Sequence, residues 1–183
     1  MHDTAAPWAE ASSLLASSFY DFLNEDGMTF EEFESRSIAY GHAAIADAIS
    51  AALERKDKSL CADLPDGCKV HDKRPKMLAS EVGDLSFSYR RVRDAYGNTV
   101  IPLADSLDLP WCSRVTPGAR SFLVDAGADV SYQKAANLMA RRGSRVSATT
   151  VMNSLRVAGA LCAEEDAELA EDLFANGVAP QGE

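Results

Sequence analysis

The residues best suited to bind a charged ligand lie between positions 131 and 162, where basic side chains occur and acidic ones do not. The whole chain of 183 residues carries 18 Lys and Arg against 28 Asp and Glu, a net charge of −10, so this segment differs from its surroundings. Clusters of positive charge bind the phosphates of nucleic acids. The segment is therefore the first candidate for a nucleic-acid contact, through Lys134, Arg141, Arg142, Arg145 and Arg156.

A helix predicted from Ser147 to about Gly159 divides into two faces. Small and apolar residues at helical spacing would face a core: Ala148, Val151, Leu155 and Ala158. Polar residues recur on the other face, and in a major groove Asn pairs with adenine, Arg pairs with guanine and the Thr methyl contacts thymine. We therefore predict that four side chains read base edges: Thr149, Thr150, Asn153 and Arg156.

The arginines just before this helix would serve a different purpose. Arg141, Arg142 and Arg145 lie at the end of the preceding helix and in the turn, where they could hold phosphates and fix the register on DNA. Ser147 would cap the helix and could donate to a phosphate. The alternative interpretation is a helical hairpin whose polar face is only solvated.

A second basic cluster, Arg90, Arg91 and Arg93, lies near the end of a predicted strand. A basic hairpin can lie along a DNA backbone, so these three residues are secondary candidates for backbone contacts. The alternative is a strand end with solubilising arginines.

Motifs for catalysis are missing from the sequence. It contains no Gly-rich phosphate loop, no Gly-x-Ser-x-Gly and no His-Glu-x-x-His, so we predict no catalytic residue. Cys61, Cys68 and His71 could bind zinc, but the spacing of the two cysteines is longer than in a zinc knuckle. We predict no metal site, no cofactor, and reduced cysteines.

The helices and strands that would position these residues are predicted from the spacing of apolar residues and from capping and turn residues. A helical stripe covers 11–23, and Thr29 with Glu32 forms a capping box that opens a helix to about Lys58. These N-terminal helices are candidates for self-association. A loop is predicted over 61–75, followed by a meander with strands at 77–82, 85–90 and 99–101 and turns at Gly83-Asp84 and 94–98.

Three further helices complete the fold class. Thr116-Pro117, Ser131 and Ser147 are start signals, and Gly127, Gly143 and Gly159 are expected stops. The short Gly-containing turn 143–146 predicts a helix-turn-helix. The expected fold is mainly α with a small antiparallel β-meander and a C-terminal helix-turn-helix. It has four expected parts: an N-terminal helical segment (1–60), a loop with the meander (61–112), a helix-turn-helix domain (113–162) and an acidic tail (163–183).

Regional charge supports this division. Residues 1–58 have a net charge of −7, residues 59–162 of +4 and residues 163–183 of −7. No apolar run is long enough to span a membrane, and the first residues do not resemble a secretory signal, so a cytoplasmic protein is expected.

The order of motifs between 73 and 160 resembles the N-terminal half of the ISLre-type insertion-sequence transposases. The resemblance covers Gly83, Tyr89 to Arg93, Pro102 to Leu109, Ser131 to Ala136, and Ser147 to Val151. It implies a module that recognises the ends of a mobile element, with a metal-dependent nuclease domain of the DDE type downstream that this sequence does not contain. None of the matching positions is catalytic. Asp105-Ser106 departs from the Asp-Glu typical of that family.

The sequence thus favours specific binding of double-stranded DNA as the recognition region of a transposase. Two alternatives stay open: a stand-alone helix-turn-helix transcriptional regulator, and a module for protein interaction or oligomerisation that does not bind DNA. The acidic ends could also mask the basic centre within one chain, in which case deleting 163–183 should tighten DNA binding.

Overall fold

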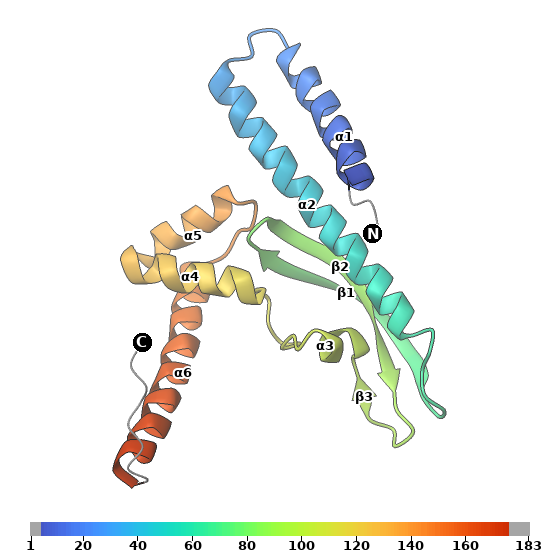
Figure 1. Cartoon of the computed structure of the whole chain (residues 1–183), viewed down its shortest axis with the longest axis vertical. Coiled ribbons are helices and arrows are strands. Elements are labelled where there is room, and N and C mark those ends of the chain that lie inside the picture. The colour runs from blue at the N-terminus through green and yellow to red at the C-terminus, as the bar shows by residue number, and fades with distance from the viewer. Residues whose placement is uncertain (1–4, 176–183) are drawn as a thin grey trace. The chain divides into compact units, whose positions relative to one another are not determined.

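The computed structural model describes residues 5–175, which form six helices and three strands (Figure 1). In chain order they are α1 (Ala5–Leu23), α2 (Phe30–Leu60), β1 (Lys69–Ser80), β2 (Gly83–Arg93), β3 (Thr99–Val100), α3 (Pro102–Ser106), α4 (Pro117–Asp129), α5 (Tyr132–Arg141) and α6 (Ala148–Ala175). The strands form one antiparallel sheet in the order β1-β2-β3. The prediction of a mainly α fold with a small antiparallel meander is confirmed.

The chain divides into two compact units, which we describe separately. Unit 1 contains residues 1–76 and 85–103, and unit 2 contains 77–84 and 104–183. This division cuts across the expected part 61–112, because the meander is shared between the units, whereas residues 113–162 lie wholly in unit 2. Most of β2 belongs with the N-terminal helices, whereas the β1–β2 turn belongs with the C-terminal helices.

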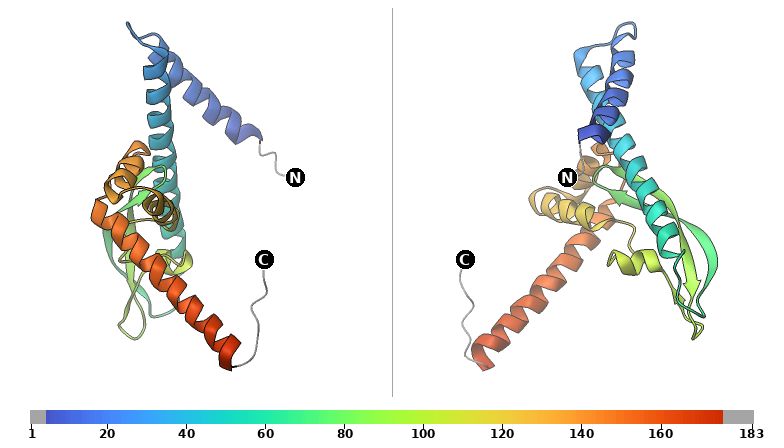
Figure 2. Two further views of the ribbon diagram at one scale, coloured as in Figure 1. Left: turned by 90° about the vertical axis from the view of Figure 1, so that its left-hand side faces the viewer. Right: turned by 45° about the vertical axis from the view of Figure 1, so that its right-hand side comes forward.

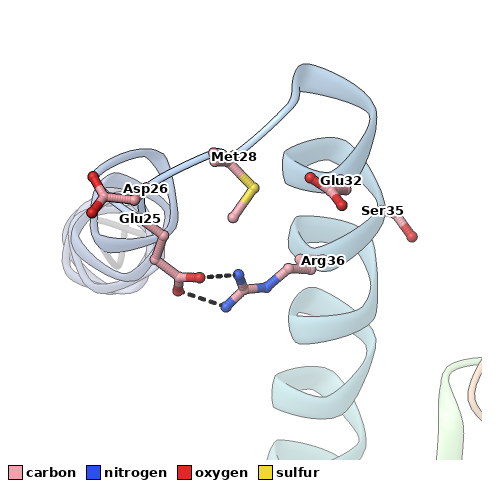
Figure 3. Close-up of a pocket in the computed structure, with 7 residues that line it drawn as sticks. Glu25, Asp26, Met28, Glu32, Ser35 and Arg36 are labelled. Carbon is pink, nitrogen blue, oxygen red and sulfur yellow. Dashed lines mark hydrogen bonds and ion pairs between the residues drawn. The ribbon is translucent and has the colours of Figure 1, made fainter.

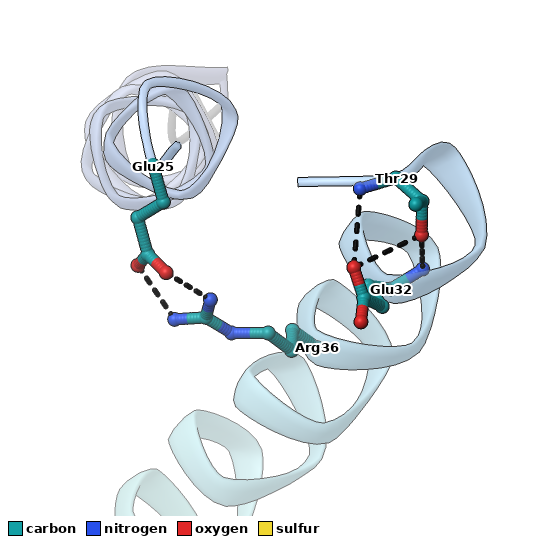
Figure 4. A network of polar contacts seen from close by, with 4 residues as sticks. All are labelled: Glu25, Thr29, Glu32 and Arg36. Carbon is teal, nitrogen blue, oxygen red and sulfur yellow. Dashed lines mark hydrogen bonds and ion pairs between the residues drawn. The ribbon is translucent and has the colours of Figure 1, made fainter. Parts of the chain in front are cut away.

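The α1–α2 hairpin of unit 1 is closed by polar and aromatic contacts near its connection. Thr29 caps α2, and the predicted capping box with Glu32 is present (Figure 4). Both oxygens of Glu25 accept from the Arg36 guanidinium, which also lies over the Phe22 ring at 4.4 Å. Away from this end the two helices diverge (Figure 2). Among the described side chains of the hairpin, these contacts therefore hold the two helices together near their connection.

The edge of β2 in unit 1 is completed by a helix. β3 pairs only with Val92 and Arg93, so the preceding stretch of this edge lacks a strand neighbour among the described residues. Three side chains of α2 take its place: Ser50 accepts from the Ser86 N–H at 3.1 Å, Glu54 from the Ser88 N–H at 2.6 Å, and Asp57 from the Arg90 N–H at 2.9 Å. Alternate N–H groups of a strand point to one edge, and helical positions i, i+4 and i+7 share one face, so the two periods match. This arrangement satisfies backbone donors that would otherwise be an open edge.

Unit 2 is built on three helices around a small core. Thr116, Ser131 and Ser147 each accept a backbone N–H at a helix start, which confirms the three predicted caps. The core contains Val115, Ala119, Leu123, Ala135, Ala136, Met139 and Val151. The hairpin end of β1 joins this unit through hydrogen bonds of Ala79 with Arg114 and Thr116.

Several predicted boundaries were wrong. β1 begins at Lys69, so residues 69–75 are strand and not loop. This part of β1 has no apolar alternation, and its Pro75 is tolerated because β1 is an edge strand. The hairpin turn lies at Glu81-Val82, and Gly83 at φ +123° begins β2.

Two helices also run past their expected ends. α4 continues through Gly127, where an added Cβ would lie 2.5 Å from Leu155 Cδ1 and 2.9 Å from Val151 Cγ1, so this glycine allows close approach of α4 and α6. α6 continues through Gly159 to Ala175, because an internal glycine costs a helix only about 1 kcal/mol and its neighbours here are good helix formers.

Candidate nucleic-acid interface

The first turns of α6 have one buried and one exposed face, as the sequence predicted. Val151 is fully buried, and Leu155, Ala148 and Ala158 are partly buried. Thr149, Asn153 and Arg156 are exposed on the other side. The three candidate base-reading residues therefore lie in a row on a solvent-facing surface.

Thr150 is half-buried and has a local partner. Its hydroxyl lies 3.0 Å from the Ser147 Oγ, and its backbone N–H donates to the same Ser147 atom at 3.1 Å. Both hydroxyls thus take part in the cap of α6. Ser147 remains exposed at this cap.

The connection between α5 and α6 is fixed by contacts with the β1–β2 turn inside unit 2. Ser144 is fully buried, and its Oγ accepts from the Ser80 N–H at 3.1 Å. Gly143 has φ +93°, and a Cβ there would lie 3.2 Å from the Gly83 Cα. A glycine at this position meets both the backbone conformation and the close approach. The start of α6 therefore has a defined place in unit 2.

The basic residues around this connection differ in their surroundings. Arg141 and Arg145 are exposed, as is Lys134 on α5. Within residues 5–175, neither arginine forms an ion pair. Arg142 instead donates to Glu81 at 2.8 Å and lies over the Phe122 ring at 4.0 Å. We therefore assign Arg142 a role in holding unit 2 together, which differs from the predicted phosphate contact.

The secondary cluster is largely occupied by carboxylates of unit 1. Arg90 pairs with Asp57, whose side chain is fully buried, and Arg91 pairs with Asp72. The Arg91 and Arg74 guanidinium groups hold the pKa of Asp72 well below its usual range. Arg93 alone of the three is exposed. Arg90 and Arg91 therefore have structural partners that the sequence analysis did not identify.

Asp57, Glu81 and Asp72 are the residues that the sequence analysis missed. Asp57 carried a signal, because Ser50, Glu54 and Asp57 form a polar row at helical spacing. The other two carried none, since each partner lies far away in the sequence: Asp72 is 19 residues from Arg91 and Glu81 is 61 residues from Arg142.

A polar hollow of about 380 Å³ lies at the α1–α2 connection and is lined by Glu25, Asp26, Glu32, Ser35 and Arg36, among others (Figure 3). Two of its three acidic groups, Glu25 and Glu32, already have partners within the hairpin. The hydrogen bond from Arg36 lowers the pKa of Glu25, and the hydrogen bonds from Thr29 lower the pKa of Glu32. We interpret the hollow as the outer side of a structural network.

The cysteines show no arrangement for metal binding or disulfide formation. No group of three or more His, Cys, Asp or Glu side chains suited to a metal ion occurs in the described part of the chain. All four cysteines are free thiols, and burial together with the nearby Asp57 carboxylate raises the pKa of Cys61. Among the helices within residues 5–175, none combines the length and apolar character needed to cross a bilayer.

A family model matches residues 23–172, from the end of α1 to the last turns of α6. The chain belongs to the uncharacterised protein family UPF0236. No curated protein matches the sequence. The UPF0236 match covers helices of both units and the entire sheet, so the polar face of α6 and the α2–β2 contacts lie in the region that defines the family.

Proposed function

We propose that this chain binds double-stranded DNA in a sequence-specific manner, as the recognition region of an ISLre-type transposase. The observation that carries the proposal is the exposed row of Thr149, Asn153 and Arg156 on the first turns of α6, opposite the buried Val151. In this proposal α5 and α6 act as a helix-turn-helix, and the start of α6 enters the major groove.

Each exposed polar group has a role in the proposed complex. Asn153 and Arg156 can each form paired hydrogen bonds with a base edge, to adenine and guanine respectively, and the Thr149 methyl can contact thymine. Arg141 and Arg145, with the cap at Ser147, would hold phosphates on either side of the groove. The closely packed core around Val151 and Gly127 would keep these groups in a fixed arrangement.

Regional charge supports the same surface. All charged side chains in residues 131–162 are basic, although the chain as a whole has a net charge of −10. Association with a polyanion depends on the local potential at the contact surface. We assign recognition but no catalytic step to this chain, and we place it in the cytoplasm, where its thiols would stay reduced.

The first experiment selects binding sites from a pool of random duplex DNA at two salt concentrations and sequences the retained fraction. The proposal expects an enriched motif and an affinity that falls steeply with salt. A motif that matches the end of a mobile element supports the transposase assignment, whereas a palindrome supports a stand-alone regulator. Loss of both enrichment and salt dependence would refute DNA binding.

Substitutions then separate base contacts from phosphate contacts. Arg156→Ala and Asn153→Ala should each weaken binding to the selected site by about 1–3 kcal/mol and relax the preference at one base pair. Arg114→Ala is a matched control, because Arg114 is an exposed arginine of unit 2 outside the proposed surface. If Arg156→Ala weakens binding to all sequences equally, its base-reading role is wrong.

A further inference from the structure

The α1–α2 hairpin has an apolar groove that the described residues of unit 1 do not fill. The groove has a volume of about 640 Å³ and is lined by residues of both helices. The two helices diverge away from their connection (Figure 2). Its lining includes Leu14 and Leu15 of α1, and Ile45, Ala48 and Ile49 of α2. Leu14 is 73% exposed and Ile45 is 47% exposed. Large apolar side chains gathered in this way on a surface indicate a binding partner.

The groove continues along one face of α2 as a seam with heptad spacing. The seam comprises Glu31, Glu34, Ile38, Gly41, Ile45, Ala48, Ala52, Arg55 and Ser59. Its positions alternate by three and four residues, which is the spacing of a helix that packs against another helix. The opposite face of α2 is already used, because it holds Ala46, Ser50 and Asp57 against β2. The seam is therefore a second packing face on the same helix.

Gly41 gives an independent indication of a close neighbour. A glycine within a helix makes the helix less stable than alanine would at the same position. Nothing lies within 4 Å of the position that a Cβ would occupy at Gly41, so no contact within the described residues requires a glycine there. A helix packed closely on this seam would require one.

Charge along the seam identifies the partner. Its first turns carry Glu31 and Glu34, and its last turns carry Arg55, with Lys56 beside it. A shallow hollow lined by Ala48, Ala52, Arg55 and Lys56 continues the groove at the basic end. A seam that is acidic at one end, apolar in the middle and basic at the other is complementary to itself when one copy is reversed.

We propose that the groove is filled by α2 of a second copy of this chain, running antiparallel to α2. In this dimer Glu31 and Glu34 lie beside the partner's Arg55 and the partner's Lys56, and the reverse contact forms at the other end. The two-fold symmetry places the apolar middle of each seam against the other, and α1 of each copy covers the outer side. The proposal concerns unit 1 and does not depend on DNA binding by unit 2.

The first test measures the mass of the full chain in solution by sedimentation equilibrium across the micromolar range. We expect a dimer for the natural sequence. Ala48→Glu and Gly41→Gln should each raise the dimer Kd at least about tenfold, because they place a polar side chain in the apolar seam. Gly41→Gln favours the helix and has open space around it, so far-ultraviolet circular dichroism should show an unchanged fold.

Charge reversal tests the antiparallel orientation. Glu31→Lys with Glu34→Lys, or Arg55→Glu with Lys56→Glu, should each raise the dimer Kd about tenfold through repulsion between like charges. An equimolar mixture of these two proteins should form a heterodimer as stable as the natural dimer, because every contact again joins opposite charges. Asp47→Lys and Lys58→Glu are matched controls that alter exposed charges of α2 off the seam and should leave the Kd unchanged.

Three results would overturn the proposal. A monomer throughout the measured range excludes the dimer. A dimer that Ala48→Glu does not weaken uses another surface. A dimer that neither charge reversal weakens, or that is not restored on mixing, does not have the antiparallel arrangement.

Discussion

Arg90 and Arg91 of the sheet differ in their surroundings from Arg141, Arg145 and Arg156 of unit 2, although all five side chains carry the same charge. Arg90 and Arg91 on β2 are bound by Asp57 and Asp72, and their side chains are only 27% and 24% exposed. Arg141, Arg145 and Arg156 in unit 2 are exposed. Only the second group has guanidinium groups that a large anionic partner can reach without breaking an existing pair.

The comparison shows that residues distant in the sequence determine whether an arginine stabilises the fold or is available for binding. An arginine whose partner is a buried carboxylate stabilises the fold, because losing either member leaves an uncompensated charge. An exposed arginine contributes little to stability and is available for binding. Loss of the Arg90 or Arg91 pair should therefore change folding, whereas substitution of Arg141, Arg145 or Arg156 should change binding.

The largest expected effect comes from removing the buried carboxylate. Asp57→Ala should lower the free energy of unfolding by about 3 kcal/mol, because the Arg90 guanidinium and one backbone N–H of β2 would lose their acceptor. Urea denaturation followed by circular dichroism would measure the change. Asp47→Ala, at an exposed position of the same helix, should leave the unfolding free energy nearly unchanged. Equal effects of the two variants would contradict the role of Asp57.

A glycine pair tests the packing that holds the polar face of α6. Gly127→Val should destabilise the protein by about 2 kcal/mol, because its side chain would collide with Val151 and Leu155. Gly159→Ala, on an exposed part of α6 with open space around it, should stabilise the helix by about 1 kcal/mol. Thermal unfolding of both variants checks the opposite signs. A stable Gly127→Val protein would show that α4 and α6 do not approach as described.

The exposed arginines should affect the salt dependence of binding without affecting folding. Arg145→Ala should lower the slope of log affinity against log salt by about 1 and leave the melting temperature unchanged. Arg93→Ala is the comparison from unit 1, since Arg93 is exposed at the end of β2. Titration of labelled duplex DNA at several salt concentrations provides the slopes. If Arg93→Ala changes the slope as much as Arg145→Ala does, binding is not confined to unit 2.

The smallest effect concerns acid stability. The pKa of Asp72 is lowered in the folded protein, so this group contributes stability that is present above its ordinary unfolded value of about 3.9 and is lost as the pH falls below it. Asp72→Asn should make urea unfolding less dependent on pH between roughly 5 and 3, because one contribution to that dependence is removed. An unchanged pH profile would show that the pairs of Asp72 with Arg91 and Arg74 are not maintained in solution.

The sequence predicted the features that depend on local signals. The caps at Thr29, Thr116, Ser131 and Ser147 need only a side chain and a backbone group three residues away, so they could be read directly. The two faces of α6 followed from helical spacing alone. The base-reading and phosphate roles of these residues stay predictions.

Features that depend on contacts between distant residues could not be read in the same way. Lys69 to Pro75 has the composition of a loop and becomes strand only because β2 lies beside it. Gly127 is typical of a helix stop, and its real role is visible only when α6 is packed against it. Residues 163–175 continue α6 beyond its first turns, which the sequence analysis did not expect, and masking of the basic centre by the acidic ends stays a prediction. Residues 176–183 lie outside the described residues.

The unbroken course of α6 has a consequence for how the protein would meet DNA. Its first turns carry Arg156 and lie near Arg145, whereas its second half carries Glu164, Glu165, Asp166, Glu168 and Glu171. The helix macrodipole has the same direction, positive at the start and negative at the end. The side chains and the backbone thus form one electric dipole, and the field of a polyanion exerts a torque that turns the start of α6 toward it. Encounters would be oriented before contact, and the association rate would fall as salt screens that field.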